Sequence, residues 1–592
     1  MPPGRGHSHL VPSSSDRRQD LRYQADETPS YPVSFGLAFQ YILLNIAGIV
    51  ITVAIVVRAG GGSEDYLTWA AFAALIVCGI TTLLQAKPLA GRIGAGYILL
   101  MGTSGVFIAV SVAALQLGGP SLLATLIVAS SLFQFLISSR LSLLRRVITP
   151  TVAGTVIMLI AVTVMPIGFD LLFVAPEGAA PEAAPLTALT TMAITIVIVL
   201  RARGALRLWG SVIGAVAGCL VASAYGTYNM ELVSAAAWFG VPAGGWPGFD
   251  LRLGVEFWAM LPAFIFVTLV GAIETIGDGM AIQRVSWRKR RATDFRAVQG
   301  AVAADGVGNL LSGLLATVPN TTYSNSVSIV DITGIAARRV GVCIGLIFIA
   351  LAFFPKAAAV LLAIPDPVVG AYIIVLIAIL FVLGVEMVAQ DGIDYRKATI
   401  IGVSFWIGAG FQSGQIPSEY FGEWAGSLLQ NGMTSGGLTA ILLSAFMELS
   451  GPRRRRIETG LNVDAQPKIR DFLEAFAAKA GLGEEMAGRM ALAAEETLLV
   501  LLDQADRDDA LGERRLRVTA RAESGGVELE FLAATGEGNI EDRMALVGGR
   551  AAEVPVEHDF SLRLLRHLAS SVRHQKYHDT DIVTVRVDPV GG

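Results

Sequence analysis

Long apolar runs recur through most of this chain, from Phe35 to Met447. About fourteen runs of roughly 15–22 residues can be counted, which is the length range of spanning or half-spanning helices. Only 16% of the 592 residues are charged, against about 25% in a typical soluble domain. We therefore expect a polytopic α-helical membrane protein. The predicted spans centre near Ile46, Ala74, Phe107, Leu126, Met158, Ile196, Val216, Val267, Leu310, Val327, Ile347, Val375, Val403 and Leu442.

The loops between these runs alternate in charge. With the N-terminus inside, the predicted inner loops carry most of the Lys and Arg residues, as the positive-inside rule requires, and the predicted outer loops carry mostly acids. The even number of spans then places both termini in the cytoplasm of a bacterium, with the spans in its inner membrane. Residues 1–32 are polar and rich in Ser, Arg and Pro, so they are expected to be a disordered cytoplasmic tail.

One predicted span carries two carboxylates, in the motif Glu274-Thr-Ile-Gly-Asp278. Positions i and i+4 share a helix face. An acid at bilayer depth is costly and is expected to face a watery cavity, a partner or a bound substrate. The pair is therefore a candidate transport site. The alternative is a buried pair held by helix–helix hydrogen bonds, and Asp305 in a later span has the same two interpretations.

The two halves of the membrane region show an internal repeat. The segment that starts at Thr149-Pro150 resembles the one that starts at Pro365, since both continue with Val-x-Gly in the same register. Two polar segments, 97–107 and 319–332, lie third in each half and do not read as full helices. Interrupted segments at matching positions of an inverted repeat indicate a binding site. We therefore predict a 7+7 inverted repeat, with a chance match of one proline motif as the alternative.

The chain changes character near its end. Residues 451–460 read as a basic linker, and residues 461–592 as a separate cytoplasmic domain. Helical patterns at 468–480 and 484–503, strands at 516–523 and 527–534, a helix at 560–572 and a last strand at 582–587 predict an α/β sandwich.

Several motifs in the membrane region resemble those of the nucleobase–cation symporters of the xanthine, uracil and ascorbate permease family. The resemblance covers about residues 34–447 and includes Cys78-Gly-Ile-Thr-Thr-Leu-Leu-Gln85, Glu274-Thr-Ile-Gly-Asp278, Ala304-Asp305-Gly-Val-Gly-Asn309, Thr321-Thr-Tyr323, Thr333-Gly-Ile-Ala-Ala-Arg-Arg-Val340 and Ile364-Pro-Asp-Pro-Val-Val-Gly370. It implies fourteen segments arranged as a core domain and a gate domain, and a homodimer formed through the gate.

By this resemblance, Glu274 binds the ring edge of a base through its two acceptor oxygens. Unwound stretches at Gly102-Thr-Ser104-Gly105 and Ser324-Asn325-Ser326 would supply backbone donors, which is tolerated at membrane depth where the backbone lines a cavity. Burial favours the protonated form of a carboxyl group, so Glu274, Asp278 or Asp305 could carry the coupling proton. Sodium is the second choice of ion. The predicted substrate-binding residues are Glu274, Asn325, Ser324, Ser326, Ser104, Gly105 and Tyr41.

The chain also departs from the family pattern. Asn325, Ser326 and Ser328 replace the Gln/Glu, Asn and Gly that usually follow Thr-Thr-Tyr, and Tyr41 replaces a His common after a Gln in the first segment. The pocket is therefore rebuilt. A purine such as xanthine or urate is the first candidate, because relatives with the Glu-x-x-Gly-Asp pattern favour it.

The C-terminal domain resembles the ATP-binding fold of histidine kinases and anti-sigma-factor kinases. Val500 stands where that family has its magnesium-binding Asn, and Ala534 replaces the Asp of the loop that continues with Gly536 and Gly538. The loss of both should abolish ATP–Mg binding, so we predict a pseudo-ATPase domain without a cofactor. The three cysteines have no metal-ligand spacing, and no metal is expected.

These observations favour a symporter that moves a nucleobase-like heterocycle with protons by alternating access, in contact with membrane lipids. No enzymatic activity and no nucleic-acid partner are expected. One alternative is a transporter of a different small solute. Another is a solute sensor that signals through its C-terminal domain to a soluble protein partner.

Overall fold

The computed structural model describes residues 21–141, 149–176, 178–242, 245–289, 291–390, 392–422, 426, 429–450, 454–506, 515–523, 526–533, 564–578 and 580–589. The chain divides into two compact units. One comprises Leu21–Ser286 and Ala297–Phe446, and the other contains Met447–Gly592. We call them the membrane unit and the C-terminal unit.

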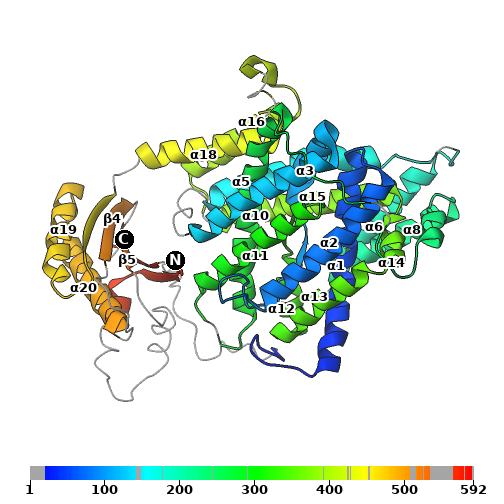
Figure 1. The fold of residues 1–592 in the computed structure, drawn as a ribbon. Coiled ribbons are helices and arrows are strands. Elements are labelled where there is room, and N and C mark those ends of the chain that lie inside the picture. The colour runs from blue at the N-terminus through cyan, green and yellow to red at the C-terminus, as the bar shows by residue number, and fades with distance from the viewer. Residues whose placement is uncertain are drawn as a thin grey trace, which may run out of the picture. The chain divides into compact units, whose positions relative to one another are not determined.

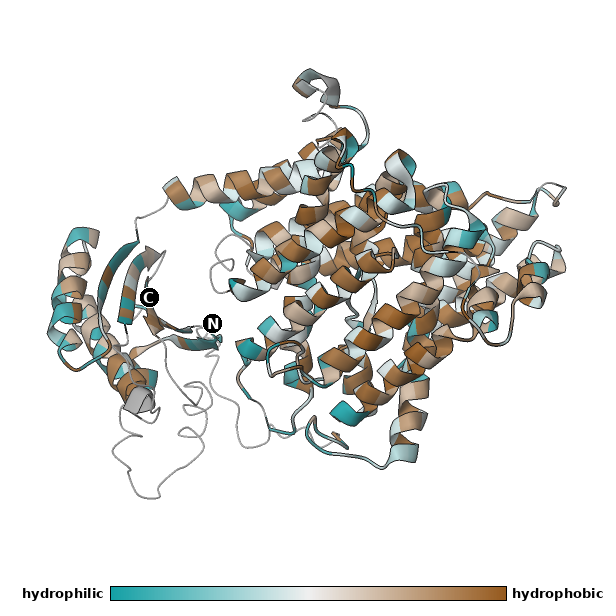
Figure 2. Cartoon of the chain, viewed as in Figure 1, coloured by the Kyte–Doolittle hydropathy of each residue, from teal (hydrophilic) through white to brown (hydrophobic). Residues whose placement is uncertain are grey.

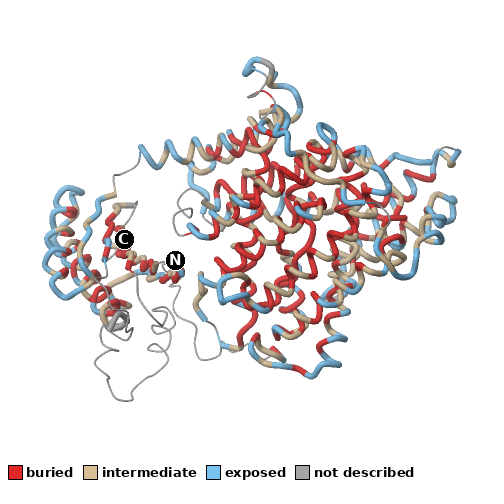
Figure 3. Tube along the Cα trace, viewed as in Figure 1, coloured by how far each residue is buried: buried red, intermediate tan, exposed pale blue. Residues whose placement is uncertain are grey.

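The membrane unit is built mainly of helices (Figure 1), and two short strands, β1 and β2, lie among them. Hydrophobic residues dominate its long helices (Figure 2), and its buried residues form a continuous interior (Figure 3). Its elements are α1 (Tyr31–Ala59), α2 (Glu64–Ala86), β1 (Met101–Thr103), η1 (Gly105–Phe107), α3 (Ile108–Ser139), α5 (Pro150–Leu171), α6 (Ala183–Arg201), α7 (Ala205–Leu208), α8 (Gly210–Ala224), α9 (Met230–Ala235), α10 (Val255–Val285), α11 (Phe295–Leu314), β2 (Asn320–Thr322), α12 (Asn325–Thr333), α13 (Arg338–Ala352), α14 (Pro355–Leu362), α15 (Asp366–Gln390), α16 (Tyr395–Gln412), η2 (Ser418–Phe421) and α18 (Gly432–Ser450).

Eight described helical segments are long and apolar enough to cross a membrane: α1, α2, η1–α3, α5, α6, α10, α15 and α18. A ninth is formed if α13 and α14, which meet at 85°, count as one span. The segment η1–α3 covers two predicted spans, and its helical dihedrals break at Gly119, where φ is 70°. The helices at four other predicted spans, α8, α11, α12 and α16, are too short or not apolar enough to be counted as spans. A multi-pass membrane protein is confirmed, and the count of fourteen stays a prediction.

Helices α5 and α15, which start at the two repeated proline motifs, pack closely along their length. A Cβ atom added to Gly154 of α5 would lie 2.5 Å from the carbonyl oxygen of Gly384 in α15, and one added to Gly370 of α15 would lie 2.8 Å from that of Gly168 in α5. The first glycine of each helix therefore meets the second glycine of the other. Such reciprocal contacts require antiparallel helices and small residues at both crossing points.

The predicted disordered tail at 1–32 is wrong for its last residues. Leu21 and Ala25 are buried, and Tyr23 pairs with Ile335 next to α13. The N–H groups of Arg22 and Tyr23 both donate to the carbonyl of Gly334. This segment is ordered because its backbone groups find partners in the loop between α12 and α13. Residues 1–20 lie outside the described chain.

The C-terminal unit has an antiparallel sheet in the order β3-β4-β5-β7-β6 with two helices packed on it. Its apolar core includes Leu473, Phe476, Leu501 and Phe531. The elements are β3 (Arg455–Gly460), α19 (Ala465–Ala480), α20 (Glu484–Asp506), β4 (Arg515–Glu523), β5 (Gly526–Ala533), β6 (Ser571–Lys576) and β7 (Asp581–Val587).

Two expectations for this unit need correction. Residues 455–460, predicted as linker, form the edge strand β3, because the backbone of this segment pairs in antiparallel register with β4. The predicted helix 560–572 ends early. In its described part only 564–568 are helical, and Ser571–Lys576 form β6 paired with β7. The pairing with β7 outweighs a local pattern that also suits a helix.

Candidate functional site

The two interrupted segments of the membrane unit pair with each other. β1 and β2 form a two-stranded antiparallel ribbon with Met101 opposite Thr322 and Thr103 opposite Asn320. Each strand leads into a helix: β1 into η1 and α3, and β2 into α12. Neither segment is a full helix, as predicted. The ribbon is buried, so its backbone groups are satisfied inside the protein and not by lipid.

A close approach of Tyr323 to β1 stabilises the ribbon. The Tyr323 ring lies over Gly102 so closely that a Cβ atom at that position would overlap it. The Tyr323 hydroxyl donates to the carbonyl of Thr103 at 3.1 Å, and the Tyr323 N–H donates to the carbonyl of Leu100 at 2.8 Å. Position 102 therefore requires glycine because the ring takes the space of a side chain.

Helix α10 places its two carboxylates beside this ribbon. It packs against η1, β2 and α12. Asp278 is 6% exposed, and its Oδ2 accepts a hydrogen bond from the Thr322 hydroxyl of β2 at 2.7 Å. Asp278 thus links α10 to β2.

Glu274, one turn earlier, differs from Asp278 in its surroundings. Its side chain is partly accessible, yet its Oε2 atom is buried and has no hydrogen-bond partner in the described part of the chain. A buried carboxylate oxygen without a donor is costly, and such groups are rare unless a ligand or water completes them. Asp305 also has one buried oxygen without a partner, its Oδ1, but Glu274 is the one of the three acids that accepts no hydrogen bond from the described residues.

Asp305 belongs to a hydrogen-bond network between helices. Its Oδ2 accepts from Gln134 Nε2 of α3 at 2.6 Å and from the Thr275 hydroxyl of α10 at 3.0 Å. Gln134 Oε1 in turn accepts from Asn309 at 2.8 Å, and Asn309 accepts from the backbone N–H of Asn320 in β2 at 2.9 Å. The network joins α3, α10, α11 and the ribbon. It satisfies Oδ2 of Asp305, whereas Oδ1 is buried without a partner among the described residues.

The other predicted substrate-binding residues differ in burial and in their hydrogen bonds. Ser104 is buried, and its N–H donates to the carbonyl of Pro319 at 2.8 Å, while Gly105 begins η1. Ser326 is buried and accepts from the Leu100 N–H at 2.9 Å. Asn325 is exposed, and Tyr41 is buried on α1, where its hydroxyl has no hydrogen-bond partner among the described residues. The expectation of an unwound stretch at 324–326 is wrong in part, because Asn325 and Ser326 begin α12.

Residues that sequence reasoning missed hold this site together. Gln134, Thr275, Asn309 and Thr322 all donate or accept within the buried network. Thr275, Asn309 and Thr322 stand inside the motifs that carry the family resemblance, which could have pointed to them. Gln134 is a polar residue in an apolar run, and that was its signal.

In the C-terminal unit, Val500 is 3% exposed and belongs to the apolar core. It therefore has no access to a bound metal ion. Ala534, Gly536 and Gly538, the other predicted positions of the degenerate nucleotide site, lie outside the described residues.

Comparisons with known proteins place the membrane region. Residues 34–415 match the model of the Permease family that is built on xanthine and uracil permeases. A putative purine permease of Clostridium perfringens is 28% identical over 444 residues, covering 73% of this chain and 94% of that protein. The xanthine permease XanP of Escherichia coli is 27% identical over 463 residues (73% and 96%), and the uric acid permease PucK of Bacillus subtilis is 27% identical over 432 residues (72% and 97%).

Among solved structures, the transmembrane domain of a cyanobacterial bicarbonate transporter, BicA, aligns with a TM-score of 0.42 and 16% identity, covering 71% of this chain and 99% of that one. The family match extends over most of the membrane unit, from α1 to the end of α16. The chain therefore belongs to the Permease family of nucleobase–cation symporters and is a multi-pass membrane permease.

Proposed function

We propose that this chain is a secondary transporter that moves a nucleobase-like heterocycle together with a proton by alternating access. A purine such as xanthine or urate is the first candidate substrate, because the relatives at 27–28% identity are named as purine, xanthine and uric acid permeases. Sodium is the second candidate for the coupling ion.

The observation that carries the proposal is the unpaired Oε2 atom of Glu274 beside the strand ribbon. Xanthine and urate carry ring N–H groups next to carbonyl oxygens along one edge. A carboxylate can accept two such N–H groups. The carbonyls would meet the first-turn N–H groups of η1 and α12, since a helix N-terminus attracts electron-rich groups. Glu274 thus binds the donors, and the two helix starts after β1 and β2 bind the acceptors.

The other two acids would support this site. Asp278, which accepts from Thr322, positions α10 against β2. Asp305 joins the network through Gln134 and Thr275. A proton that arrives at any of the three carboxylates alters the charge felt by the other two, because they lie within electrostatic reach of one another. This coupling between neighbouring acids is the proposed link between proton and substrate.

The remaining features follow the family pattern. We infer a 7+7 inverted repeat, a homodimer formed through the gate domain, and cytoplasmic termini in a bacterial inner membrane. The reciprocal glycine contacts between α5 and α15 support the repeat, because a twofold relation between halves would produce them. The C-terminal unit is proposed to bind a soluble protein partner.

Uptake of radiolabelled xanthine, urate and uracil into proteoliposomes tests the proposal. We expect uptake of at least one purine that requires an inward proton gradient and persists without sodium. Glu274→Gln should abolish it. Glu256→Gln is the matched control, since Glu256 is an exposed acid in the first turn of the same helix. Absence of uptake for every heterocycle would reject the substrate class, and full uptake by Glu274→Gln would reject the site.

A further inference from the structure

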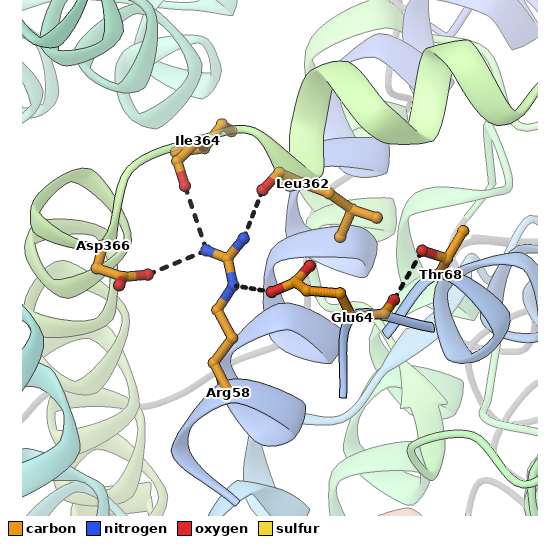
Figure 4. Close-up of polar contacts among 6 residues, drawn as sticks. All are labelled: Arg58, Glu64, Thr68, Leu362, Ile364 and Asp366. Carbon is orange, nitrogen blue, oxygen red and sulfur yellow. Dashed lines mark hydrogen bonds and ion pairs between the residues drawn. The ribbon is translucent and has the colours of Figure 1, made fainter. Parts of the chain in front are cut away.

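Arg58, at the end of α1, contacts the junction between α14 and α15 (Figure 4). Its Nη2 donates to the carbonyl of Leu362 at 2.7 Å. Its Nη1 donates to the carboxylate of Asp366 at 3.0 Å and approaches the carbonyl of Ile364 at 3.5 Å. The planar fork of a guanidinium suits this arrangement, because one nitrogen can hold one helix while the other reaches a second.

The chemistry of the junction explains why a cation lies there. Leu362 is the last residue of α14, so its carbonyl is among those that a helix end leaves without an internal partner. Asp366 is the first residue of α15, where a negative charge is favoured by the helix dipole. Arg58 therefore satisfies one helix end and pairs with the acid that stabilises the next. Glu64 of α2 is a weaker neighbour, 3.9 Å from Arg58 Nε and 65% exposed.

The ion pair joins two groups of helices, which also meet where Gly48 of α1 faces the Tyr372 hydroxyl of α15. α1 packs on α13, α2 and α3, and α14 packs on α1 and α2. α15 instead packs on α5, α6 and α8. The hydrogen bond to Leu362 thus stays within the α1 group, whereas the ion pair to Asp366 crosses to the α15 group.

A cavity of about 450 Å³ lies beside the ion pair. The α1 group contributes Arg58 and Glu64 to its wall, and the other side includes Ala184 of α6 and Asp366 of α15. A change in the distance between the two groups would therefore change the width of this cavity. The ion pair spans the same gap.

We propose that the Arg58–Asp366 ion pair is a conformational latch, which holds the α1 and α15 groups together in this structure and breaks when the groups separate to widen the cavity. The inference rests on the proposed alternating-access transport, in which such groups move relative to each other. Because both side chains are about a quarter exposed, the latch is expected to be weak, so that it biases the conformational equilibrium by roughly 2- to 5-fold.

A cysteine in the cavity wall tests the latch. Ala184 is 4% exposed and lines the cavity from α6. Ala184→Cys is made in the full chain after Cys78, Cys219 and Cys343 are replaced by Ala, and its reaction rate with a membrane-impermeant maleimide is measured without any substrate. We expect Arg58→Gln and Asp366→Asn each to raise this rate about 2- to 5-fold. The double variant should not exceed the larger single effect, since both remove the same contact.

Two further variants make the result specific. Glu64→Gln is the matched control, because it removes a neighbouring charge of the same type from the same arginine and should leave the rate unchanged. Arg58→Lys keeps the positive charge but lacks the planar guanidinium, so it should give an intermediate labelling rate. This variant also provides a test if Arg58→Gln does not fold. Unchanged rates in both single variants, additive effects in the double variant, or an equal effect of Glu64→Gln would each overturn the latch.

The labelling assay tests the latch, and the uptake assay tests the proposed function, so a negative result in one does not decide the other. Labelling needs no substrate, so a chain that transports no heterocycle but still shows the non-additive rate increase would reject the proposed function and retain the latch. Uptake that depends on Glu274, together with unchanged labelling, would reject the latch alone.

Discussion

The hydroxyl of Thr322 donates a hydrogen bond of 2.7 Å to the carboxylate of Asp278 and so joins the strand ribbon to the helix that carries Glu274. The donor is on β2 and the acceptor is one turn from Glu274 on α10. This hydrogen bond does not involve the substrate. It nevertheless fixes where Glu274 lies relative to the helix starts that follow β1 and β2.

Thr322→Val should weaken substrate binding without abolishing the fold. The substitution keeps the shape and removes the donor to the carboxylate, a hydrogen bond worth about 1.5–3 kcal/mol to the folded state. Only the part of this energy that holds Glu274 in its binding position is lost from substrate binding, so a fall in affinity of roughly 10-fold is expected. Thr322→Ser keeps the hydroxyl and should lose much less. Binding of radiolabelled purine to the purified variants measures the difference. Equal affinities for the Val and Ser variants would contradict a positioning role for this hydrogen bond.

Gln134→Leu should lower the stability of the membrane unit. Gln134 donates to Asp305 and accepts from Asn309. Its loss removes two buried hydrogen bonds, which leaves the Asn309 side-chain N–H without an acceptor and leaves Asp305 Oδ2 with Thr275 as its one donor. Each lost hydrogen bond costs about 1–3 kcal/mol, and more where the group is charged. Gln116→Leu is the control on the same helix, because Gln116 is exposed and makes one hydrogen bond to a carbonyl. Thermal unfolding in detergent compares the two. A similar midpoint for both variants would show that the network adds no stability.

The sequence was sufficient to predict the elements that carry the site, because their signals are local. Two acids at i and i+4 in an apolar run indicate one helix face, and α10 has them there. The polar character of segments 97–107 and 319–332 predicted breaks in the helices, and β1 and β2 lie within them.

The contacts between elements could not be predicted in the same way. Nothing in the periodicity of either segment indicates that Met101 lies opposite Thr322, or that Gln134 of α3 meets Asp305 of α11. A single Gln among apolar residues looks the same whether it faces a network or a helix carbonyl. Asn325 and Ser326 are likewise helical and not unwound because α12 begins directly after the ribbon, and the sequence does not show where that helix begins.

Gly154→Ala and Gly384→Ala should each destabilise the packing of α5 on α15. A Cβ atom at Gly154 would lie 2.5 Å from the carbonyl oxygen of Gly384, and one at Gly384 would lie 2.7 Å from that of Gly154. Overpacking of this kind costs about 1–3 kcal/mol. Gly402→Ala on α16 is the control, because its Cβ would meet no atom within 4 Å. Thermal midpoints that fall equally in all three variants would indicate a general effect of alanine and not of the crossing.

Mg-ATP should not bind the C-terminal unit. Val500 is buried in the apolar core, where it offers neither a metal ligand nor access to one. The thermal midpoint of the full chain is therefore expected to stay unchanged on addition of Mg-ATP, since a ligand raises stability only by binding the folded state. A saturable increase that requires both nucleotide and magnesium would contradict the pseudo-ATPase interpretation.

Removal of residues 454–592, which include β3, distinguishes a transporter from a sensor. A transporter whose C-terminal unit recruits a protein partner should retain purine uptake in proteoliposomes after the deletion. Uptake that disappears although the truncated chain still binds purine would show that the unit takes part in the transport cycle. A chain that binds purine and transports none, with or without the unit, would favour the sensor.

The C-terminal unit should lose stability as the pH falls below neutrality, because of His574 in β6. Its side chain is fully buried, 3.9 Å from the Asp581 carboxylate. Burial, with a smaller contribution from the charge of Lys576, lowers the pKa of His574 from 6.5 to about 4. The unfolded chain therefore takes up a proton below about pH 6.5 that the folded unit takes up only near pH 4, so stability falls with pH across this window.

The expected loss is about 1 kcal/mol between pH 7.5 and pH 5.5. His574→Gln removes the titrating group and should remove this part of the pH dependence. Hydrogen exchange of the β6 and β7 amides in the full chain, corrected for the intrinsic effect of pH on exchange, measures the opening of this part of the sheet. Protection that falls by a similar amount in the wild type and in His574→Gln would assign the pH dependence to other groups, because the variant cannot take up a proton at position 574.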